Sequence, residues 1–390
     1  MLMMPLGIVP FWITGLLSLG LLGGGIYLGW AWYEGVVIGT GYLVSSIAMV
    51  LFSLLGRLLM LALLGRKTGT TNHDVVPARS HRLTRPDGTI LHIEEAGPDD
   101  APTLLLTHGW GLSSAVWRDM KQHLAGRYRL VMWDLPGLGR STGPKRADYS
   151  LEKMAGDLEA VVAFCGPGPI VLLGHSIGGM ITLTLCRLSP HLLGTRVSGL
   201  VLADTTYTNP VRTARFHAVL RILQKPILEP LLFLQILLTP LVWVLNWLSY
   251  LNGTVHLLTH LTQFGGKETS EQLDFVCRYS LRDSPAVIAR GMFGMFRYDA
   301  TEVLPTISVP VLVINGDRDQ LTLPEAGETI RATVPRGERA EVRPAGHLAF
   351  MEKNEEVDAA VRSFAAACLP DLGAHSSRSA RSRDTTLSAS

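Results

Sequence analysis

The sequence predicts an α/β fold, with a mostly parallel sheet and helices on both of its faces, preceded by a helical hairpin that crosses a membrane. Short apolar runs of strand length recur along the chain and are separated by segments with helical periodicity, which is the pattern of a parallel sheet. The chain begins differently: residues 1–33 contain no Lys, Arg, Asp or Glu, and after Glu34 residues 35–56 contain none either. Stretches of about 20 apolar residues are long enough to span a bilayer.

The first predicted element is the hairpin, with one span near Pro10–Trp32 and a second near Val36–Leu55, joined by a tight turn at Glu34-Gly35. Small residues would let the two helices approach closely, and aromatic residues suit the membrane interface. These residues are Gly15, Gly20, Gly23, Gly24, Gly39 and Gly41, and Trp12, Trp30, Trp32 and Tyr33. A buried hairpin in a soluble protein is the alternative, but neither stretch has a polar face to show to water. A cleaved signal peptide is disfavoured because its positively charged start is missing.

Positive charges set the expected orientation of the hairpin. Arg57, Arg66 and Lys67 follow the second span, whereas the connecting loop offers only Glu34. Because cytoplasmic loops carry an excess of Lys and Arg, we expect a multi-pass membrane protein with the rest of the chain on the cytoplasmic side. The cysteines are scattered singly and lack zinc-site spacing, so they are expected to be buried free thiols, in agreement with a reducing compartment. They are Cys165, Cys186, Cys277 and Cys368.

After the hairpin, the strands and helices of the sheet follow in order. Arg82–Thr84 and Ile90–Ile93 flank a Pro86-Asp87-Gly88 turn and predict a strand hairpin at the sheet edge. The segment Leu151–Phe164 has helical periodicity and starts just after Tyr149-Ser150. Continuous apolar runs predict buried strands at 103–107, 128–133, 170–173, 197–203 and 309–314.

The strand at 170–173 runs into Gly174-His175-Ser176-Ile177-Gly178, a G-x-S-x-G sequence. Glycine at the two outer positions lets the chain turn sharply from strand to helix and leaves the serine hydroxyl exposed. Ser176 is therefore a candidate nucleophile. In a chain with 39 glycines the pattern alone is weak evidence, so its context decides.

Three further segments supply that context. The strand at 103–107 runs into His108-Gly109-Trp110-Gly111, where an oxyanion-binding amide is needed. The strand at 309–314 runs into Asn315-Gly316-Asp317-Arg318-Asp319, and Pro344-Ala345-Gly346-His347 follows another short strand. The order along the chain is serine, acid, histidine.

Together with the loop Asp134–Ser141, these motifs resemble the α/β-hydrolase superfamily over about residues 79–369. The resemblance is to the capped serine hydrolases, which include esterases, lipases and monoacylglycerol lipases. It implies an α/β-hydrolase fold with a helical cap inserted after strand six. Epoxide hydrolases and haloalkane dehalogenases of this fold attack an sp³ carbon and have aspartate at the elbow, so Ser176 indicates acyl chemistry.

The resemblance also implies the site residues: a triad of Ser176, Asp319 and His347, with the backbone N–H groups of Trp110 and Ile177 as the oxyanion hole. The histidine would take the serine proton during attack on a carbonyl, and the aspartate would hold the imidazole in the useful tautomer. The amide of Ile177 would lie at a helix N-terminus, where the helix dipole favours an anion.

Other residues compete for these roles. Asp317 shares a loop with Asp319, and Asp204 ends the strand at 197–203, where some relatives carry the acid. The family spacing favours Asp319, and Asp204 is expected to cap the next segment. Two histidines, His108 and His175, flank the site and are expected to orient loops or to contact substrate rather than to carry protons.

A third apolar segment, residues 230–266, contains no charged residue. As a membrane span it would place Ser176 and His347 on opposite sides of the bilayer, which the proposed chemistry forbids. We therefore expect a helical cap at residues 205–300, with an apolar face on the membrane surface or over the active site. A cap core packed only on itself is the alternative.

Within the cap, prolines are expected to break the apolar segment into short helices, at Pro226, Pro230 and Pro240. Large apolar and aromatic side chains are candidate contacts with lipid, namely Phe233, Trp243, Trp247 and Tyr250. Of these, Phe233 and Trp243 are also candidate substrate contacts.

The expected organisation is a membrane anchor (1–67), a first part of the hydrolase core (68–204), the cap (205–300), a second part of the core (301–370) and a disordered Ser- and Arg-rich tail (371–390). A net charge of +2 gives no case for nucleic acid. Gly137-Leu138-Gly139 lacks the third glycine and the context of a dinucleotide loop, so no cofactor is expected. Because the cysteines lack zinc-site spacing, no metal is expected either. Oligomeric state leaves no mark in the sequence.

These features predict a membrane-anchored serine hydrolase that cleaves carboxylic esters of lipophilic substrates, such as monoacylglycerols or other lipid esters, through an acyl-Ser176 intermediate. Three alternatives remain open. The same triad supports acyl transfer to an alcohol or amine, and it supports cofactor-free peroxidase or carbon–carbon hydrolase chemistry. A catalytically silent membrane scaffold that keeps the fold is the third, since fold does not guarantee function.

Overall fold

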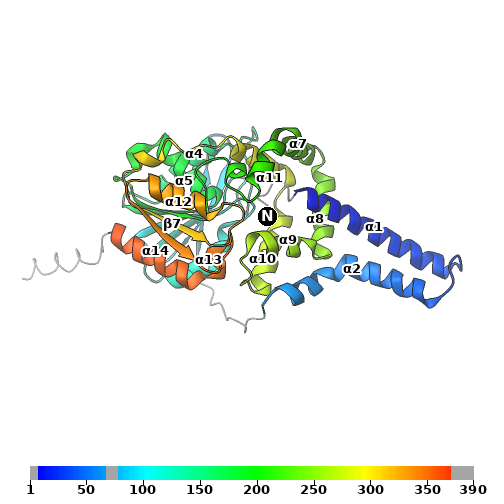
Figure 1. Cartoon of the computed structure of the whole chain (residues 1–390). Coiled ribbons are helices and arrows are strands. Elements are labelled where there is room, and N and C mark those ends of the chain that lie inside the picture. The colour runs from blue at the N-terminus through cyan, green and yellow to red at the C-terminus, as the bar shows by residue number, and fades with distance from the viewer. Residues whose placement is uncertain (1–7, 67–77, 370–390) are drawn as a thin grey trace, which may run out of the picture.

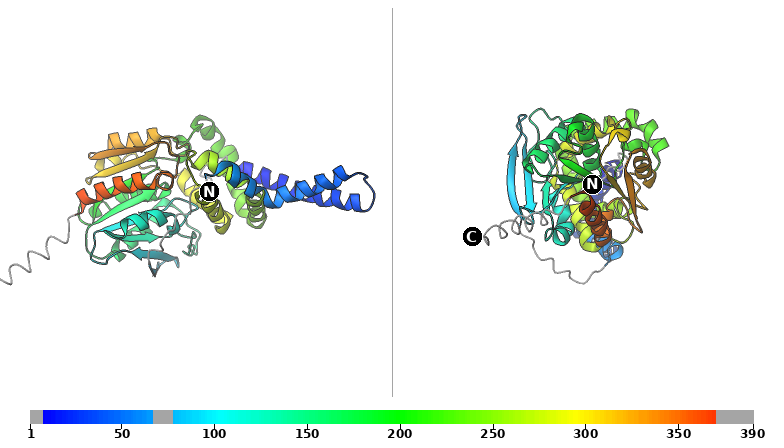
Figure 2. Two further views of the ribbon diagram at one scale, coloured as in Figure 1. Left: turned by 90° about the horizontal axis from the view of Figure 1, so that it is seen from below. Right: turned by 90° about the vertical axis from the view of Figure 1, so that its left-hand side faces the viewer.

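The computed structural model describes residues 8–66 and 78–369. The predicted basic flank at Lys67 and the predicted disorder of the tail 371–390 lie outside the described residues. Figure 1 shows three parts in a row: a sheet between helices, a layer of short helices, and a long helical hairpin that projects away from both. The view from below in Figure 2 shows the same row.

The core is one eight-stranded sheet in the order β1-β2-β4-β3-β5-β6-β7-β8. The strands β1 and β2 form an antiparallel pair, β2 also pairs antiparallel with β4, and the remaining neighbours are parallel. This is the predicted mostly parallel sheet with a strand hairpin at one edge. The strands are β1 Arg79–Thr84, β2 Ile90–Ala96, β3 Thr103–Thr107, β4 Arg129–Trp133, β5 Ile170–His175, β6 Val197–Ala203, β7 Val311–Gly316 and β8 Gly337–Val342.

Helices cover both faces of this sheet. One face packs against α4 (Leu151–Phe164), α5 (Ile177–Leu188) and α12 (Pro324–Thr333), whose buried apolar residues share one core cluster. The other face packs against α3 (Arg118–Leu124) and α14 (Asn354–Cys368), with the short α13 (Ala349–Glu352) nearby in the second cluster. Because the central strands are buried on both faces, their sequences are continuous apolar runs rather than alternating ones.

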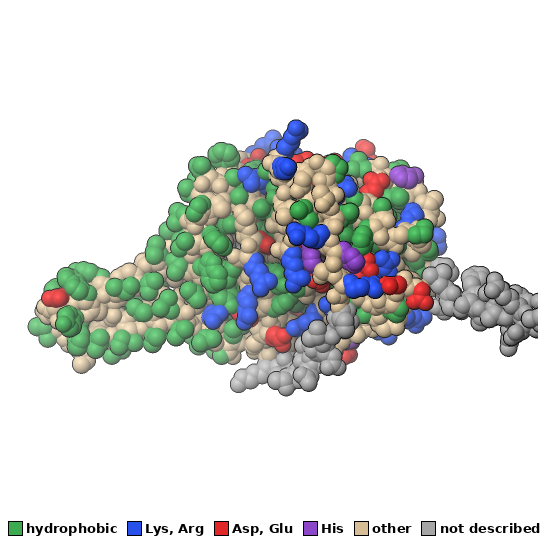
Figure 3. Space-filling model, turned by 180° about the vertical axis from the view of Figure 1, so that it is seen from behind, with side chains coloured by type: hydrophobic (Ala, Val, Ile, Leu, Met, Phe, Trp, Pro, Cys, Tyr) green, Lys and Arg blue, Asp and Glu red, His purple; other side chains and the backbone are tan. Residues whose placement is uncertain are grey.

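The hairpin consists of α1 (Ile8–Tyr33) and α2 (Thr40–Leu64). By length and composition, Trp12–Tyr33 and Thr40–Leu64 are each able to cross a membrane, and Figure 3 shows their surface covered with hydrophobic side chains. The predicted second span, Val36–Leu55, was placed too early. Gly35 and Gly39 have positive φ angles and form the connection, and α2 then continues past Arg57.

The glycines that bring the two helices together are mostly not the predicted ones. A Cβ added at Gly24 would lie 3.2 Å from the nearest atom of α2. The corresponding distances are 3.0 Å at Gly25 and 2.7 Å at Gly29. Nothing lies within 4 Å of such a Cβ at the predicted positions Gly20, Gly23 and Gly41. Close packing of the two helices therefore depends on one face of α1, which composition alone does not identify.

A group of helices lies between β6 and β7, where the cap is predicted. It comprises α6 (His217–Leu223), a π-helical turn η5 (Gln224–Leu228), α7 (Glu229–Leu237), α8 (Thr239–Leu251), α9 (Thr254–Gln263), α10 (Ser270–Arg282) and α11 (Pro285–Phe296). The prediction that Pro226 and Pro230 break the chain is wrong, because the π-helical turn and the first turn of α7 accommodate them. Of the three prolines, only Pro240 lies at a bend, where the α6–α7 run and α8 meet at 100°. This apolar segment therefore does not form a straight span.

The hairpin docks against these cap helices at its open end. A Cβ at Gly15 of α1 would lie 2.8 Å from a side-chain atom of α8, and a Cβ at Gly56 of α2 would lie 2.5 Å from the backbone just after α8. The Arg57 guanidinium donates to the Tyr250 hydroxyl at 2.7 Å and also lies over its ring. Arg57 therefore links α2 to α8 of the cap.

Candidate active site

The serine lies on the turn between β5 and α5. Ser176 has φ 56° and ψ −119°, a strained conformation for a residue with a side chain. A Cβ at Gly174 would lie 2.5 Å from the backbone of Gly178, and a Cβ at Gly178 would lie 2.3 Å from the Thr107 carbonyl oxygen. Only glycine fits at both positions, which is why the G-x-S-x-G pattern produces this sharp turn.

The structure brings Ser176, His347 and Asp319 together from three separate loops. The distance between Ser176 Oγ and His347 Nε2 is 2.9 Å, and the distance between His347 Nδ1 and Asp319 Oδ2 is 2.8 Å. All three side chains are buried. Both contacts are within the range required of a nucleophile, its base and the group that orients the base.

The Asp319 carboxylate is held by its own loop. It accepts hydrogen bonds from the backbone N–H groups of Leu321 at 2.8 Å and Thr322 at 3.1 Å, and from the Thr322 hydroxyl at 2.6 Å. With His347, these donors surround the buried carboxylate. These contacts fix the orientation of the carboxylate toward His347 Nδ1.

The two rival aspartates have other partners. Asp317 accepts a hydrogen bond from the Ala345 N–H at 3.0 Å. Asp204 accepts from Gly316 N–H at 2.8 Å and Ala349 N–H at 3.3 Å, so it links the end of β7 to the start of α13 and does not cap the next segment as predicted. Burial raises the pKa of Asp204 well above its ordinary value, and the nearby Asp319 charge raises it further.

The two predicted oxyanion donors come from different elements beside the serine. Ile177 is the first residue of α5, and the N–H groups of a first helical turn have no acceptor within the helix. Trp110 lies in the loop after β3 and lines the cavity next to Ser176. Its indole N–H donates to the Ile288 carbonyl of α11 at 3.1 Å, and Gly291 leaves room for the ring, so the cap holds this loop in place.

His108 connects two loops rather than facing the cavity. Its Nδ1 lies 2.8 Å from the Gly109 carbonyl oxygen, and its Nε2 accepts from the Leu135 N–H at 3.0 Å. Burial lowers the pKa of the imidazole, which keeps it neutral with its proton on Nδ1. The structure does not place His108 among the cavity-lining residues, so its position fits loop orientation and not substrate contact.

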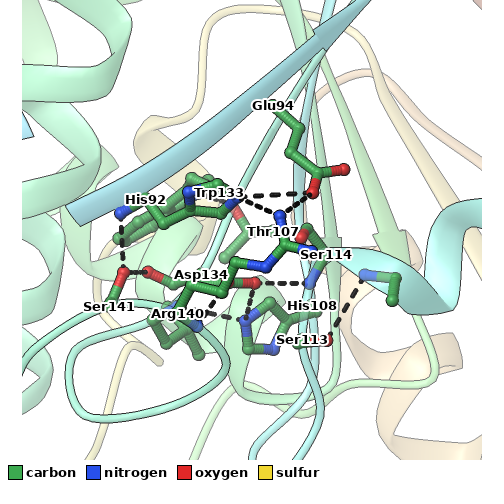
Figure 4. A network of polar contacts seen from close by, with 12 residues as sticks. His92, Glu94, Thr107, His108, Ser113, Ser114, Trp133, Asp134, Arg140 and Ser141 are labelled. Carbon is green, nitrogen blue, oxygen red and sulfur yellow. Dashed lines mark hydrogen bonds and ion pairs between the residues drawn. The ribbon is translucent and has the colours of Figure 1, made fainter. Parts of the chain in front are cut away.

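A polar network links His108 to Asp134 and the residues around it (Figure 4). The Asp134 carboxylate accepts from the Ser114 N–H at 2.6 Å and from the Arg140 N–H at 2.8 Å, and the Ser141 hydroxyl donates to the Asp134 carbonyl at 2.7 Å. Asp134 therefore fixes the loop after β3 against the loop after β4. The 134–141 motif therefore has a structural role, because it positions the backbone of the loop after β3 that contains Trp110.

His175 does line the cavity and contacts the loop that carries His347. Its Nε2 lies 2.9 Å from the His347 carbonyl oxygen, which requires a proton on Nε2. Burial, followed by the charge that His347 can carry, lowers the pKa of His175 well below its ordinary value. We infer a neutral histidine that positions the backbone of His347.

Residues of the cap cover the cavity at Ser176. Gln263 at the end of α9 and Val276 of α10 line the cavity together with Ser176 and His347, and the cavity measures about 10 Å³, enough for about one water molecule. The predicted substrate contacts Phe233 and Trp243 do not line it. They lie on the outer surface, 65% and 48% exposed.

Glu352 is a further residue of the site that the sequence analysis missed. Its carboxylate accepts from the backbone N–H groups of Gly346 at 2.7 Å, Gly265 at 2.8 Å and Lys267 at 3.1 Å. It thus clamps the loop after α9 to the loop that carries His347. Burial raises the pKa of Glu352 despite these donors. Its position five residues after His347 is the only local signal that could have identified it.

Among residues 8–66 and 78–369, no group of three or more His, Cys, Asp or Glu side chains is arranged to hold a metal ion. Within the same ranges, Cys165, Cys186, Cys277 and Cys368 are free, and the first three are buried. Burial raises the pKa of each of these three thiols to about 12.

Comparisons with known proteins identify the family of the chain. A family model described as alpha/beta hydrolase fold matches residues 102–354. The pimeloyl-[acyl-carrier protein] methyl ester esterase of Stenotrophomonas maltophilia (strain R551-3) is 30% identical over 291 residues, which are 73% of this chain and 99% of that esterase.

Solved structures share the fold. An esterase from Exiguobacterium antarcticum superimposes with a TM-score of 0.60 at 21% identity, covering 74% of this chain and 99% of the esterase. A membrane phospholipase A, described as a novel bacterial virulence factor, has a TM-score of 0.58 at 22% identity and covers 87% of this chain and 97% of its own. At these identities the likeness shows the fold.

Proposed function

The chain belongs to the alpha/beta hydrolase fold family, and from this premise we propose that it is a membrane-anchored serine hydrolase that cleaves carboxylic esters of lipophilic substrates. The observation that carries the proposal is the pair of contacts at 2.9 and 2.8 Å that links Ser176, His347 and Asp319. The 30% identical relative over 73% of the chain is an esterase, which supports ester hydrolysis as the reaction class.

Acylation begins with the Ser176 hydroxyl. As its oxygen attacks the ester carbonyl carbon, its proton passes to His347 Nε2, which lies 2.9 Å away. The carbonyl oxygen becomes an anion that the N–H groups of Trp110 and Ile177 stabilise, and each such donor is worth about 3 kcal/mol in related reactions. Collapse of the tetrahedral intermediate breaks the ester C–O bond, and His347 returns the proton to the leaving alcohol.

Deacylation repeats these steps with water in place of the alcohol. His347 takes a proton from water, the resulting hydroxide attacks the acyl carbon, and Ser176 leaves with the proton returned by His347. Throughout, Asp319 accepts the Nδ1 hydrogen bond and stabilises the imidazolium. The products are a carboxylic acid and an alcohol.

The hairpin supports a lipophilic substrate and a membrane location. Two helices in the described part of the chain are long and apolar enough to cross a bilayer. The likeness to a membrane phospholipase A extends over 87% of the chain, against 74% for the Exiguobacterium esterase. Substrates that partition into the bilayer, such as monoacylglycerols or other lipid esters, are therefore the proposed class.

In this scheme residues 1–67 anchor the protein, 68–204 and 301–370 form the hydrolase core, and 205–300 form a lid over Ser176. The catalytic domain faces the cytoplasm, because Arg57 and Arg66 lie at the end of α2 that joins it. Acyl transfer, cofactor-free peroxidase or carbon–carbon hydrolase chemistry, and a silent scaffold stay as alternatives for the experiment below.

The test is labelling with a fluorophosphonate, which reacts with activated serines, on detergent-solubilised wild type and the Ser176→Ala variant. Hydrolysis of p-nitrophenyl esters of increasing acyl length is measured alongside. We expect labelling and hydrolysis that both disappear in the variant, with an optimum at long chains. Folded wild type that is not labelled would contradict the proposal and favour a scaffold. Labelled enzyme that releases no free acid but transfers the acyl group to an added alcohol would indicate a transferase.

A further inference from the structure

The outer surface of α6, α7 and α8 is unusually apolar for a part of the molecule that faces solvent. We call this surface the cap face; it includes Ile222, Phe233, Leu237, Trp243, Val244 and Trp247, which are between 45% and 74% exposed. Figure 3 shows hydrophobic side chains continuing from the hairpin onto the neighbouring part of the body. Contiguous exposed apolar surface of this kind marks a contact with another molecule or with a membrane.

The charges around the cap face are mostly basic. The segment 205–266 contains four basic residues and one acidic residue, Glu229, which accepts a hydrogen bond from Gln224 at 3.0 Å. Arg215, Arg221 and Lys225 are exposed on or beside α6. A surface that combines exposed apolar and basic side chains with few acids has the composition of an interfacial membrane-binding element.

The length of the hairpin fixes how far the cap face can be from a bilayer. The cap contacts α1 at Gly15 and α2 at Gly56. Beyond these contacts, residues 16–33 and 40–55 extend about 27 and 24 Å at a rise of 1.5 Å per residue. The hydrocarbon core of a bilayer is about 30 Å thick. A membrane that contains the free part of the hairpin therefore reaches α8, and its headgroup layer overlaps the cap.

From these observations we propose that the cap face inserts into the headgroup layer of a leaflet that contains anionic phospholipids, beside the point where the hairpin enters the membrane. The inference rests on the membrane anchoring proposed above. The bend of 100° between the α6–α7 run and α8 means that these apolar helices do not form one straight span. Trp243 and Trp247 of α8 are the residue type that favours this layer.

The lipid contact also deepens the proposed function. The cap contributes Gln263 and Val276 to the cavity over Ser176, and α8 and α10 share a network in which the Tyr250 hydroxyl donates to Asp274 at 2.9 Å. Helices that touch the bilayer are thus joined to helices that cover the serine. A lipid ester in the same leaflet would reach the lid without crossing water.

The experiment measures membrane depth with nitroxide spin labels on the full-length protein. Single cysteines replace Ile222 or Leu237 on the cap face, Leu51 in α2, or Ser363 on α14. The background variant is Cys368→Ser, which removes the one native cysteine that is not fully buried. Vesicles consist of phosphatidylcholine alone or of phosphatidylcholine mixed with phosphatidylglycerol. Collisions with oxygen report lipid immersion, and collisions with a nickel chelate report exposure to water.

We expect the Leu51 label to be reached by oxygen, the Ser363 label by nickel, and the two cap labels to be intermediate and deeper in the phosphatidylglycerol vesicles. Arg221→Gln with Lys225→Gln should remove that deepening. The matched control, Arg336→Gln with Arg362→Gln, removes the same charge from exposed positions on the hydrolase core and should preserve it. Loss of the deepening in the control as well would overturn the assignment to the cap charges.

Two results would separate this inference from the membrane anchor. Cap labels as accessible to nickel as the Ser363 label, with the Leu51 label immersed, would overturn the cap contact and leave the anchor intact. A Leu51 label exposed to water would overturn both. Cap labels immersed equally in both vesicle types would refute the requirement for anionic lipid.

Discussion

At the scale of single residues, the site depends on which carboxylate contacts the histidine. Asp319 lies 2.8 Å from His347 Nδ1, whereas Asp317 and Asp204 bind backbone N–H groups elsewhere. Burial raises the pKa of Asp204, and its two carboxylate oxygens accept from the N–H groups of Gly316 and Ala349 rather than from the histidine. The three aspartates therefore differ in function although they lie near one another.

We predict that Asp319→Asn lowers kcat by a factor on the order of 10⁴, because asparagine stabilises the wrong tautomer of His347. Asp317→Asn and Asp204→Asn should each retain kcat within a few-fold. Steady-state hydrolysis of a p-nitrophenyl ester by the three purified variants checks this. A large loss in Asp204→Asn with little loss in Asp319→Asn would move the acid of the triad to the end of β6.

A second residue-scale prediction concerns Asp283, which is buried between α10 and α11. Burial raises its pKa to about 7, and the Asp134 carboxylate acts in the same direction. An aspartate in the unfolded chain titrates near 3.9, so between about pH 4 and pH 7 the folded protein binds more protons than the unfolded protein. The free energy of unfolding should therefore fall as the pH rises through this window, and the loss is complete above it.

Asp283→Asn should remove this pH dependence. The variant is expected to match the wild type near pH 4 and to be more stable at pH 8, by a few kcal/mol at most. Thermal unfolding of the detergent-solubilised protein at both pH values measures the difference. The control is Asp148→Asn, an exposed aspartate, which should leave the profile unchanged. A stability gain of equal size at both pH values would contradict the assignment.

At the scale of helices and strands, the hairpin and the cap are held together by close backbone contacts. A Cβ at Gly56 would lie 2.5 Å from the Asn252 carbonyl oxygen, whereas a Cβ at Gly41 on the same helix would meet nothing within 4 Å. We predict that Gly56→Ala destabilises the protein by about 1–3 kcal/mol because α2 must move away from the cap. Gly41→Ala should be nearly neutral. The melting temperatures of the two variants are measured in the same detergent. Equal values would refute tight docking of α2 against the cap.

These elements also show what the sequence predicts and what it does not. The elbow at Ser176 was predictable because its glycines are required by contacts within one turn, and the order of strands fixed where Asp319 and His347 meet it. Gln263 and Val276 approach the serine only through the packing of α9 and α10, so no local pattern marks them. For the same reason, the rotation of α1 that brings Gly25 and Gly29 against α2 cannot be read from composition.

At the scale of the whole molecule, the hairpin is an integral part of the structure rather than a tether. It contacts α8 and the residue just after it through Gly15, Gly56 and Arg57, and Arg66 forms a parallel bridge with Thr269 in the loop after α9. Glu352 also connects that loop to the loop that carries His347. The hairpin and the candidate active site therefore share one set of contacts.

This arrangement predicts that the hairpin stays bound after the chain is cut. A protease site is inserted between residues 66 and 78, an affinity tag is placed on the hydrolase core, and the cut protein is captured in mild detergent. The hairpin fragment should remain on the resin through extensive washing, and ester hydrolysis should be retained. In the Gly56→Ala background, more of the fragment should wash off, because the contact with Asn252 is lost. A wild-type fragment that elutes at once would show instead that α1 and α2 are a detachable anchor, and that docking to the cap adds nothing to the stability of the catalytic domain.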